Sequence, residues 1–491
     1  MYRKDWIARW ATYTPEHLAL KEYDSGRCLT YKGLNEQACF LSDKFLNGLS
    51  LKTGDRLMIM AEQCLELVAL FSMAQKTGIT LVPVNFRLAP TEIDYLISDA
   101  GPELLIAQQK FADKAGCFKS NVPVVWLEDL QQELQDFAPI SFENKEIDED
   151  HPLFILYTSG TTGFPKGAIY SHKMLFWNSV NTTLSLSLDA DDLTIGCAPS
   201  FHTGGWNVLL APLLHRGGAV GLLKKFDADR LLELMEQEGC KLFFGVPTML
   251  KMMAESDLFG GTDLSTMRYF IVGGEALPLS VIRQWHDKGV RIRQGYGLTE
   301  VGPNITSLHQ DDAETKIGSI GKPNFYVDHK VVDDQNKPVG PGEIGELCLR
   351  GPMMTPGYWK NPEQTDLAIR QGWFHTGDLV KEDKQGYLYV VDRKKSMFIS
   401  GGENVYPAEV EKVLRQFPAI DEAAVIGVPD QQWGEVGRAY VSLMPDTSFK
   451  EEEIRAFCLL HLAKFKVPKY LVELGELPKN ESGKLDRKQL K

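Results

Sequence analysis

The sequence predicts an α/β protein with a large N-terminal domain and a smaller C-terminal domain. Short apolar segments alternate with helical patterns along most of the chain, as in proteins built on parallel sheets. A segment rich in glycine and hydroxyl side chains directly follows one of these apolar segments. The chain has 491 residues, whereas single hydrophobic cores stop growing near about 250–300 residues. We therefore expect at least two domains.

The strands expected in the large domain are short and apolar. Arg56–Ala61 predicts a buried strand, and residues 62–76 predict the helix that follows it. Further strands are expected at Thr80–Pro83, Leu153–Tyr157, Lys241–Val246 and Tyr269–Val272. This alternation favours parallel α/β subdomains.

The pattern changes after residue 310. Val327–Val332, Gly345–Arg350 and Tyr387–Val391 predict short strands separated by glycine and proline turns, which indicates a small antiparallel or barrel-like subdomain. A charged, turn-rich stretch follows at Asp392–Ser396. We place the boundary there, so residues 1–391 form the N-terminal domain and residues 397–491 form a small α+β domain.

Charge and composition exclude several classes of protein. The formal net charge of -13 argues against nucleic acid as the main partner and against electrostatic anchoring to an anionic membrane. None of the eight cysteines belongs to a C-x-x-C pair, and no run of about 18 apolar residues predicts a spanning helix. The expectation is a cytoplasmic protein; peripheral membrane contact and a homodimer are left open.

The strongest single signal is Tyr157-Thr-Ser-Gly-Thr-Thr-Gly-Phe-Pro-Lys-Gly167, directly after an expected strand. Glycines let the backbone approach phosphate oxygens and direct successive N–H groups at them. Hydroxyl groups add further donors and Lys166 adds positive charge. The segment predicts a phosphate-binding loop made by Thr158, Ser159, Gly160, Thr161, Thr162, Gly163 and Lys166.

Two other interpretations of this segment were weighed. The loop of P-loop NTPases reads G-x-x-x-x-G-K-[ST]. Counted from Gly160, Pro165 stands at the second glycine, and Gly167 stands where a hydroxyl should bind magnesium, so the kinase or GTPase interpretation fails. A surface turn rich in serine, threonine and glycine is the remaining structural explanation.

The segment resembles the phosphate loop of the adenylate-forming superfamily, which contains acyl- and aryl-CoA synthetases, firefly luciferase and adenylation domains of peptide synthetases. The resemblance covers nearly the whole chain, because further family motifs follow in family order. They are Phe201-His-Thr-Gly-Gly205, Gly273-Gly-Glu-Ala-Leu277, Gln294-Gly-Tyr-Gly-Leu-Thr-Glu300, Trp373-Phe-His-Thr-Gly-Asp378, Asp392-Arg393 and Pro478-Lys-Asn-Glu-Ser-Gly-Lys484. The adenylate-forming fold that this implies has a hinge, here residues 392–396, and a mobile C-terminal domain.

The resemblance implies an acid–CoA ligase that works in two steps. A carboxylate is a poor electrophile, and a mixed anhydride with AMP supplies a good leaving group. ATP would therefore give an acyl-adenylate and pyrophosphate, after which the thiol of coenzyme A would displace AMP. Because the attack joins two anions, cations and hydrogen-bond donors must neutralise the charge that grows at phosphorus.

Roles are carried over to the matching residues. Tyr296 would stack near adenine, Thr299 would bond the α-phosphate, and Glu300 with Thr158 would hold Mg²⁺. Asp378 and Arg393 would support the ribose. Further nucleotide contacts are implied at Gly274, Glu275, Gln294, Gly295 and Gly297.

The most consequential implied role belongs to Lys484, near the end of the chain. It aligns with the lysine that reaches the α-phosphate during adenylation, and a mobile domain that carries it away would open the site to a thiol. Lys395 matches the hinge position, where Asp is commoner in the family. His202 matches the aromatic gate between the acyl pocket and the pantetheine tunnel.

The acyl and CoA contacts rest on weaker correspondences. His202, Gly205, Trp206 and Gly273 would form the acyl pocket, with Gly273 and Gly274 as a flat wall that a Cβ would obstruct. Val467 replaces one basic position of the CoA set, which puts the nucleotide end of that site in doubt. The expected CoA contacts are Gly401, Gly402, Trp433, Phe465, Lys469 and Arg87.

Other functions were compared with this one. A peptide-synthetase adenylation domain is usually joined to a carrier domain, and nothing discriminates for luciferase chemistry. A catalytically silent nucleotide or acyl binder is disfavoured because Lys166, Glu300 and Lys484 occur together. For the acid, the segments Thr203–Leu210 and Phe243–Leu250 look closest to bacterial fatty-acid–CoA ligases. A medium- or long-chain fatty acid is therefore expected, with an aryl acid or o-succinylbenzoate as the alternative.

Overall fold

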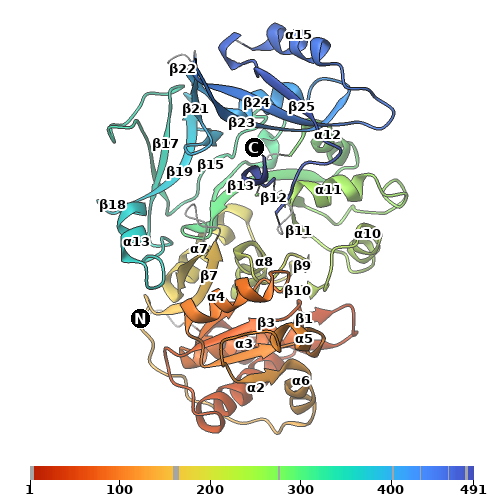
Figure 1. The fold of residues 1–491 in the computed structure, drawn as a ribbon. Coiled ribbons are helices and arrows are strands. Elements are labelled where there is room, and N and C mark those ends of the chain that lie inside the picture. Colours follow the sequence, from red (N-terminus) through yellow and green to blue (C-terminus); the bar gives the residue numbers. More distant parts are fainter. Residues whose placement is uncertain are drawn as a thin grey trace. The chain divides into compact units, whose positions relative to one another are not determined.

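The computed structural model describes residues 5–158, 165–274, 277–400, 403–431, 433–462, 464–480 and 485–490. Its contacts divide the chain into two compact units, which are described separately (Figure 1). The first unit comprises Met1–His329 and Leu349–Phe374, and the second comprises Lys330–Cys348 and His375–Lys491.

A six-stranded sheet forms one half of the first unit. Its order is β6 (Val124–Trp126), β5 (Leu104–Ala107), β3 (Arg56–Met60), β4 (Thr80–Pro83), β7 (Pro152–Thr158) and β8 (Lys166–Ser171). The first five strands are parallel and β8 is antiparallel to β7. The three strands expected here are confirmed, and β4 has the predicted bounds.

Helices cover both faces of this sheet, which explains why its strands are apolar throughout. On β3, Leu57 and Ile59 join a core that includes α2 (Tyr31–Asp43) and α3 (Leu65–Thr77). Met58 and Met60 point to the other face and pack with α4 (Pro90–Ala100). Successive side chains on a strand alternate between faces, so one short segment contributes to both cores.

A nine-stranded sheet forms the other half of the unit. Its order is β15 (Lys322–Pro323), β14 (Gly302–Ser307), β13 (Arg291–Leu298), β12 (Tyr269–Val272), β11 (Leu242–Gly245), β9 (Leu193–Gly196), β10 (Ala219–Leu222), β1 (Leu18–Glu22) and β2 (Cys28–Thr30). The six strands from β13 to β1 are parallel, and β14, β15 and β2 are antiparallel to their neighbours.

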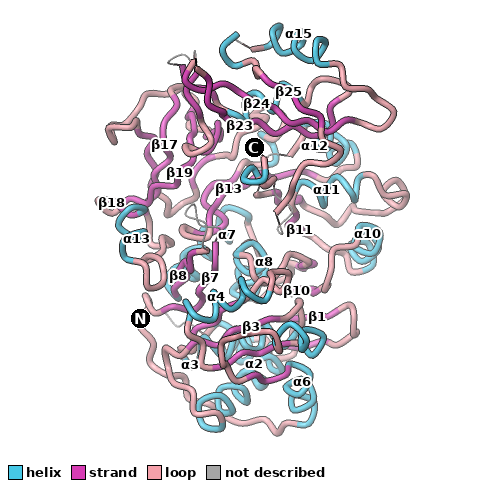
Figure 2. Tube along the Cα trace, viewed as in Figure 1, coloured by secondary structure: helices cyan, strands magenta, loops and turns pink. Residues whose placement is uncertain are grey.

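The two sheets share one core. Ile271 of β12 belongs to the same hydrophobic cluster as Leu57 of β3, together with α7 (His172–Leu186) and α9 (Leu210–Arg216). Phe270 faces the opposite side, where it packs with α10 (Ala228–Gln237), α11 (Pro247–Ala254) and α12 (Leu279–Asp287). The unit is thus layered as helix, sheet, helix, sheet, helix (Figure 2). Its other helices are α1 (Trp6–Tyr13), α5 (Ala112–Ala115), α6 (Leu127–Asp136), α8 (Thr203–Asn207) and α13 (Pro362–Ala368).

The second unit contains most of one small sheet and all of another. One runs β16 (Asp328–Val332), β17 (Ile344–Arg350) and β19 (Trp373–Glu382), with β20 (Leu388–Arg393) antiparallel to β19; the first residues of β19 pair with β18 (Ile369–Arg370). The other has the order β22 (Glu403–Val405), β21 (Phe398–Ser400), β24 (Gly434–Leu443) and β23 (Ile420–Asp430), and β25 (Tyr470–Glu473) also pairs with β24. Helices α14 (Pro407–Leu414) and α15 (Glu451–His461) share a core with this second sheet.

The compact units do not divide at residue 392. The small sheet expected after residue 310 is present, but residues 330–348 and 375–391 group with the C-terminal segment. Asp392 contributes to this grouping, because its carboxylate accepts a hydrogen bond of 2.8 Å from the backbone N–H of Ala408 in the first turn of α14. Movement of residues 397–491 about a hinge at 392–396 stays a prediction.

None of the helices in the described part of the chain is long and apolar enough to cross a membrane. The eight cysteines all lie in the described part of the chain; they form no disulfide there, and six of them are buried.

Candidate active site

The predicted phosphate loop connects β7 and β8. The two strands form an antiparallel hairpin whose register places Thr158 opposite Lys166. Residues 159–164 lie outside the described residues, so the predicted contacts of Ser159, Gly160, Thr161, Thr162 and Gly163 stay predictions. The loop's two ends, one a hydroxyl and the other an ammonium group, are therefore next to each other at the end of the sheet.

Glu300 lies in the turn between β13 and β14 and meets the start of this loop. Its Oε1 accepts a hydrogen bond of 3.5 Å from the hydroxyl of Thr158 and one of 2.9 Å from the hydroxyl of Tyr358. Its backbone carbonyl accepts a bond of 2.8 Å from the N–H of Thr355. The structure thus brings together Thr158 and Glu300, the two residues that the sequence predicts for magnesium. A carboxylate and a hydroxyl oxygen are ligands that suit this hard cation.

Lys166 points to the same cluster. Its ammonium group donates a hydrogen bond to the amide oxygen of Gln364 and lies 5.2 Å from the ring centroid of Tyr358. Burial raises the pKa of Tyr358, and the charge of Glu300 raises it further, so the phenol remains a hydrogen-bond donor at neutral pH. This arrangement joins a cation, a phenol and a carboxylate beside the phosphate loop.

Sequence reasoning missed Tyr358 and Gln364. The segment around Tyr358 is held against β8, because the N–H of Trp359 bonds the carbonyl of Gly167 at 2.7 Å and Ala168 forms a bridge with Tyr358. A Cβ on Gly167 would lie 2.7 Å from Ile155 and 3.3 Å from Trp359, so the glycine admits this close approach. The tripeptide Gly-Tyr-Trp after a proline was the available signal.

The expected adenine wall stands at the carboxyl ends of β12 and β13. The parallel register places Val272 beside Gln294, so Gly273 directly follows on one strand and Gly295 on the other. A Cβ on Gly273 would lie 3.7 Å both from the carbonyl of Gly295 and from the ring of Phe244, which is ordinary contact. The protein's own packing therefore leaves space above Gly273. Gly274 has φ +92°, and Glu275 lies outside the described residues.

The remaining predicted nucleotide residues follow on β13 and its turn. Tyr296 pairs with Thr306 of β14. A Cβ on Gly297 would lie 2.3 Å from the backbone of Pro303, so close strand approach explains this glycine. Thr299 and Glu300 occupy the turn that follows. One end of one strand therefore carries Gln294, Gly295, Tyr296, Gly297, Thr299 and Glu300.

The predicted acyl-pocket residues divide into two groups. His202 is exposed at the start of α8, with its ring 4.7 Å from that of Phe201. A Cβ on Gly205, by contrast, would lie 2.3 Å from the carbonyl of Pro199. Trp206 is 2% exposed and bonds the carbonyl of Ser200 at 2.6 Å. These contacts give Gly205 and Trp206 a packing role, and their place in an acyl pocket stays a prediction.

Phe244 is a candidate pocket residue that sequence reasoning missed. It lies on β11, and its ring is near both Gly204, where a Cβ would be 3.1 Å away, and Gly273. The sequence did not indicate this contact, because Phe244, Gly204 and Gly273 belong to three different elements that are far apart along the chain.

In the second unit, the structure brings together the two residues predicted at the ribose. Asp378 and Arg393 are opposite each other on β19 and β20, and Arg393 Nε lies 2.6 Å from Asp378 Oδ1. The carboxylate is 3% exposed, whereas the guanidinium is 58% exposed. The guanidinium of Arg393 is therefore accessible to solvent, and it orients the nearly buried carboxylate of Asp378.

The residue predicted at the hinge is on the surface. Lys395 is exposed, whereas its neighbour Lys394 pairs with Glu346 at 3.3 Å.

Most of the residues predicted to contact CoA lie in the described part of the chain. The N–H of Trp433 and the ammonium of Lys469 both bond Asp430. Phe465 is 38% exposed, and Arg87 of the first unit lies 5.9 Å from the ring of Phe86. Gly401, Gly402 and Lys484 lie outside the described residues, but just after Lys484, Arg487 bonds Glu411 at 2.7 Å.

Comparisons with known proteins agree with these motifs. Residues 7–359 match the family described as AMP-binding enzyme, and residues 409–484 match the AMP-binding enzyme C-terminal domain. A feruloyl-CoA synthase of Amycolatopsis sp is 37% identical over 98% of this chain and 96% of its own.

Two solved structures share the fold over almost the full length. An o-succinylbenzoate coenzyme A synthetase from Bacillus subtilis, in complex with ATP and magnesium ion, is 30% identical, covers 99% of both chains and has a TM-score of 0.89. A Mycobacterium tuberculosis fatty acyl CoA synthetase is 32% identical, covers 99% of this chain and 97% of its own, and has a TM-score of 0.82. The chain belongs to the AMP-binding enzyme family, which is the adenylate-forming superfamily, and within it to the branch of the AMP-forming acid–CoA ligases.

Proposed function

We propose that this chain activates an aromatic carboxylic acid with ATP and transfers the aryl acyl group to coenzyme A. The observation that carries the choice of acid is the 37% identity, over 98% of the chain, to a feruloyl-CoA synthase. The sequence analysis expected a fatty acid and left an aryl acid open as the alternative. The proposed function adopts the aryl acid. The proposed acid combines a carboxylate with a flat apolar body.

The first step is adenylation at the cluster around Glu300. Thr158 and Glu300 would hold Mg²⁺, which would neutralise charge on the phosphates when bound. Lys166 adds a cation beside the same loop, and Tyr358 keeps the carboxylate of Glu300 in one orientation. Together these groups stabilise the transition state at the α-phosphorus more than they stabilise the separate carboxylate and ATP. They can do so because they are already oriented before the negative charge develops.

Lys484 and the ribose pair complete this step. Asp378 accepts hydrogen bonds from ribose hydroxyls while Arg393 fixes the carboxylate. Lys484 donates to the α-phosphate, and its withdrawal opens the adenylate to the thiol of coenzyme A. His202 gates that approach, and Gly401 and Gly402 leave room for pantetheine. These roles rest on the resemblance to the family motifs.

Phe244 supports an aromatic acid. Its ring lies beside Gly273 and Gly204, two positions without side chains. An aromatic ring prefers offset or edge-on contact with another aromatic ring, and such pairs contribute about 0.5–1.5 kcal/mol beyond burial. A flat acid bound over Gly273 would gain this contact, whereas an alkyl chain would gain burial alone.

A fatty acid is the second candidate. The 32% identity to a fatty acyl CoA synthetase over 99% of the chain favours it. An apolar pocket discriminates by only about 1–3 kcal/mol per methylene, so activity on several acids is expected in either case.

Pyrophosphate exchange against a panel of acids tests the proposal. Purified chain is incubated with ATP, Mg²⁺, labelled pyrophosphate and one acid at a time: ferulate, benzoate, o-succinylbenzoate, octanoate and palmitate. We expect kcat/KM for ferulate or benzoate to exceed that for both alkyl acids by at least about 10-fold, which equals about 1.4 kcal/mol. A Phe244→Leu variant should reduce this preference while it retains octanoate exchange. Higher kcat/KM for the alkyl acids would contradict the aromatic assignment and leave the ligase assignment intact.

A further inference from the structure

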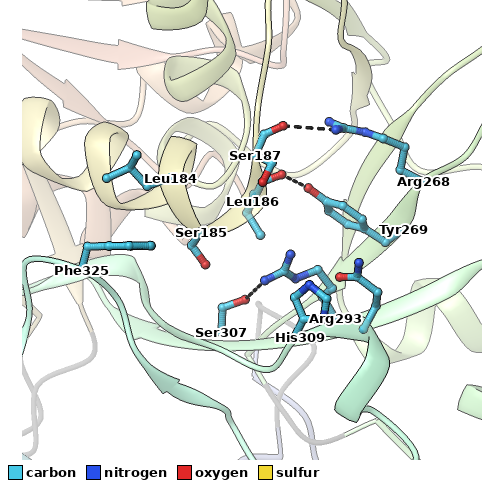
Figure 3. A pocket seen from close by; sticks show the side chains of 11 residues that line it. Leu184, Ser185, Leu186, Ser187, Arg268, Tyr269, Arg293, Ser307, His309 and Phe325 are labelled. Atoms are coloured by element: carbon cyan, nitrogen blue, oxygen red, sulfur yellow. Dashed lines mark hydrogen bonds between the residues drawn. The ribbon is translucent and has the colours of Figure 1, made fainter.

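A cavity is lined by residues of α7, β12 and β13, none of which belongs to the predicted nucleotide site. Its volume is about 490 Å³, within the range of about 300–1,000 Å³ that holds small organic ligands (Figure 3). Tyr269, which lines it, is the first residue of β12, whereas Gly273 directly follows the last residue of that strand. Tyr269 is therefore at the opposite end of β12 from the predicted adenine wall, whereas Arg293 directly precedes Gln294 on β13 and Ser307 pairs with Gly295 of the predicted nucleotide site. The walls of the cavity come from the end of α7, the starts of β12 and β13, the last residue of β14 and the segment that follows it.

Arg293 is the unusual residue in this cavity. It is 5% exposed and donates a hydrogen bond of 3.0 Å to the hydroxyl of Ser307. Among the described residues no carboxylate forms an ion pair with it, and its Nε has no hydrogen-bond partner. A buried charge without a counter-charge is costly, so proteins rarely retain one without a partner.

The neighbouring Arg268 differs in this respect. Its guanidinium pairs with Asp192 at 2.5 Å and donates a bond of 3.1 Å to the carbonyl of Ser187. Both guanidinium groups lie over the ring of Tyr269, at 5.6 Å for Arg268 and 5.2 Å for Arg293. Arg293, in contrast, has no ion-pair partner among the described residues.

The titration behaviour of Arg293 agrees with this geometry. Burial lowers its pKa, and the like charge of Arg268 lowers it further, although Tyr269 and the carboxylate of Asp311 act in the opposite direction. An anion placed in the cavity would remove much of this penalty.

We propose that this cavity binds a small organic anion whose carboxylate or phosphate group pairs with Arg293 and Ser307. The apolar part of the ligand packs against Leu184 and Phe325, which form one side of the cavity in Figure 3. Ser185 and Gln310 supply hydrogen-bonding groups around it, and Gln310 Oε1 has no partner among the described residues. This site is independent of the proposed adenylation reaction and of its acid.

Binding of defined probes tests the proposal. Isothermal titration calorimetry of the full chain uses phenyl phosphate and benzoate as the two anions and benzyl alcohol as the uncharged control. The variants are Arg293→Gln and, as the matched control, Arg291→Gln, which changes a 53% exposed arginine on the same strand. We expect at least one anion to bind wild type and Arg291→Gln with equal affinity, and Arg293→Gln to bind it at least about 10-fold more weakly. Benzoate that binds at the adenylation site is distinguished because Arg293→Gln leaves that binding unchanged.

Thermal unfolding without any anion gives an independent readout. Arg293→Gln should melt at the wild-type temperature or above it, because the substitution removes a buried cation that has no ion-pair partner among the described residues. Should that variant fail to fold, Ser185→Trp fills the cavity from a partly exposed position and should abolish anion binding. The proposal is overturned if neither anion binds wild type at 10 mM, if benzyl alcohol binds as tightly as the anions, or if no anion binds Arg293→Gln or Ser185→Trp more weakly than it binds wild type.

Discussion

The hydroxyl of Tyr358 donates a hydrogen bond of 2.9 Å to Oε1 of Glu300, the same oxygen that the hydroxyl of Thr158 approaches at 3.5 Å. A carboxylate that is held by a buried phenol presents its remaining lone pairs in a fixed direction. In metal sites, such supporting partners affect affinity almost as strongly as the ligands do.

We predict that Tyr358→Phe lowers the affinity for Mg²⁺ by about 10-fold, whereas Glu300→Gln reduces pyrophosphate exchange by at least about 10²-fold at any Mg²⁺ concentration. The measurement is the exchange rate as a function of Mg²⁺ at fixed ATP. A Tyr358→Phe enzyme with the wild-type Mg²⁺ dependence would contradict the orienting role of the phenol.

The ion pair between Asp378 and Arg393 predicts that substitution of either residue raises the KM for ATP, and that substitution of Asp378 raises it more. Asp378→Asn should raise KM for ATP by at least about 10-fold, because it weakens the buried acceptor for the ribose hydroxyls. Arg393→Ala should raise KM less, since the guanidinium acts mainly by orienting Asp378. Lys381→Ala, an exposed change on the same strand, is the control and should leave KM unchanged. If Asp378→Asn also left KM unchanged, the ribose assignment would be wrong.

Lys484→Ala should separate the two half-reactions. The lysine is proposed to face the α-phosphate only during adenylation, so pyrophosphate exchange should fall by at least about 10²-fold. Thioester formation from supplied acyl-adenylate should stay within about 3-fold of wild type. Lys488→Ala changes an exposed lysine nearby and should affect neither step. Equal loss of both half-reactions in Lys484→Ala would refute the proposed division of labour.

His215 predicts how stability depends on pH. Burial lowers its pKa from 6.5 to about 4, and the charge of Arg216 contributes; the ring stacks on Trp6 at 3.9 Å, and its Nδ1 lies 2.8 Å from the hydroxyl of Ser179. Between pH 6.5 and 4 the unfolded chain binds a proton at this histidine that the folded chain does not. The free energy of unfolding should therefore fall as pH falls, by about 2–3 kcal/mol from this group.

Urea unfolding at pH 7 and pH 4.5 measures this contribution. His215→Gln should show a smaller loss of stability than wild type over this interval, and His461→Gln, which changes an exposed histidine, should keep the wild-type loss. An identical loss in wild type and His215→Gln would show that His215 does not carry the effect.

Local patterns predicted the strands well and distant contacts poorly. Thr80–Pro83 and Tyr269–Val272 are strands with the predicted bounds, because each is a short apolar run between turns. The contact of Lys166 with Gln364 joins residues 198 positions apart, and no local pattern encodes it. Trp206 illustrates the same limit, since its contacts with Phe71 and Phe154 join residues far apart in the sequence, and no local pattern indicated them.

Local patterns do not reveal how the chain divides into compact units. Strand pairing and the bond from Ala408 to Asp392 group the strands before residue 392 with the C-terminal segment, whereas the domain boundary at 392–396 stays a prediction. Family motifs, in contrast, correctly brought together Thr158 with Glu300 and Asp378 with Arg393, because each pair belongs to motifs whose order along the chain is retained.

Product stoichiometry tests the central claim most directly. Purified chain is given ATP, Mg²⁺, coenzyme A and ferulate, and nucleotides and thioester are quantified by chromatography. The account predicts feruloyl-CoA, AMP and pyrophosphate in equal amounts, with no AMP formed when the acid is left out. Formation of ADP and phosphate in place of AMP, or the absence of ATP consumption with every acid of the panel, would contradict it.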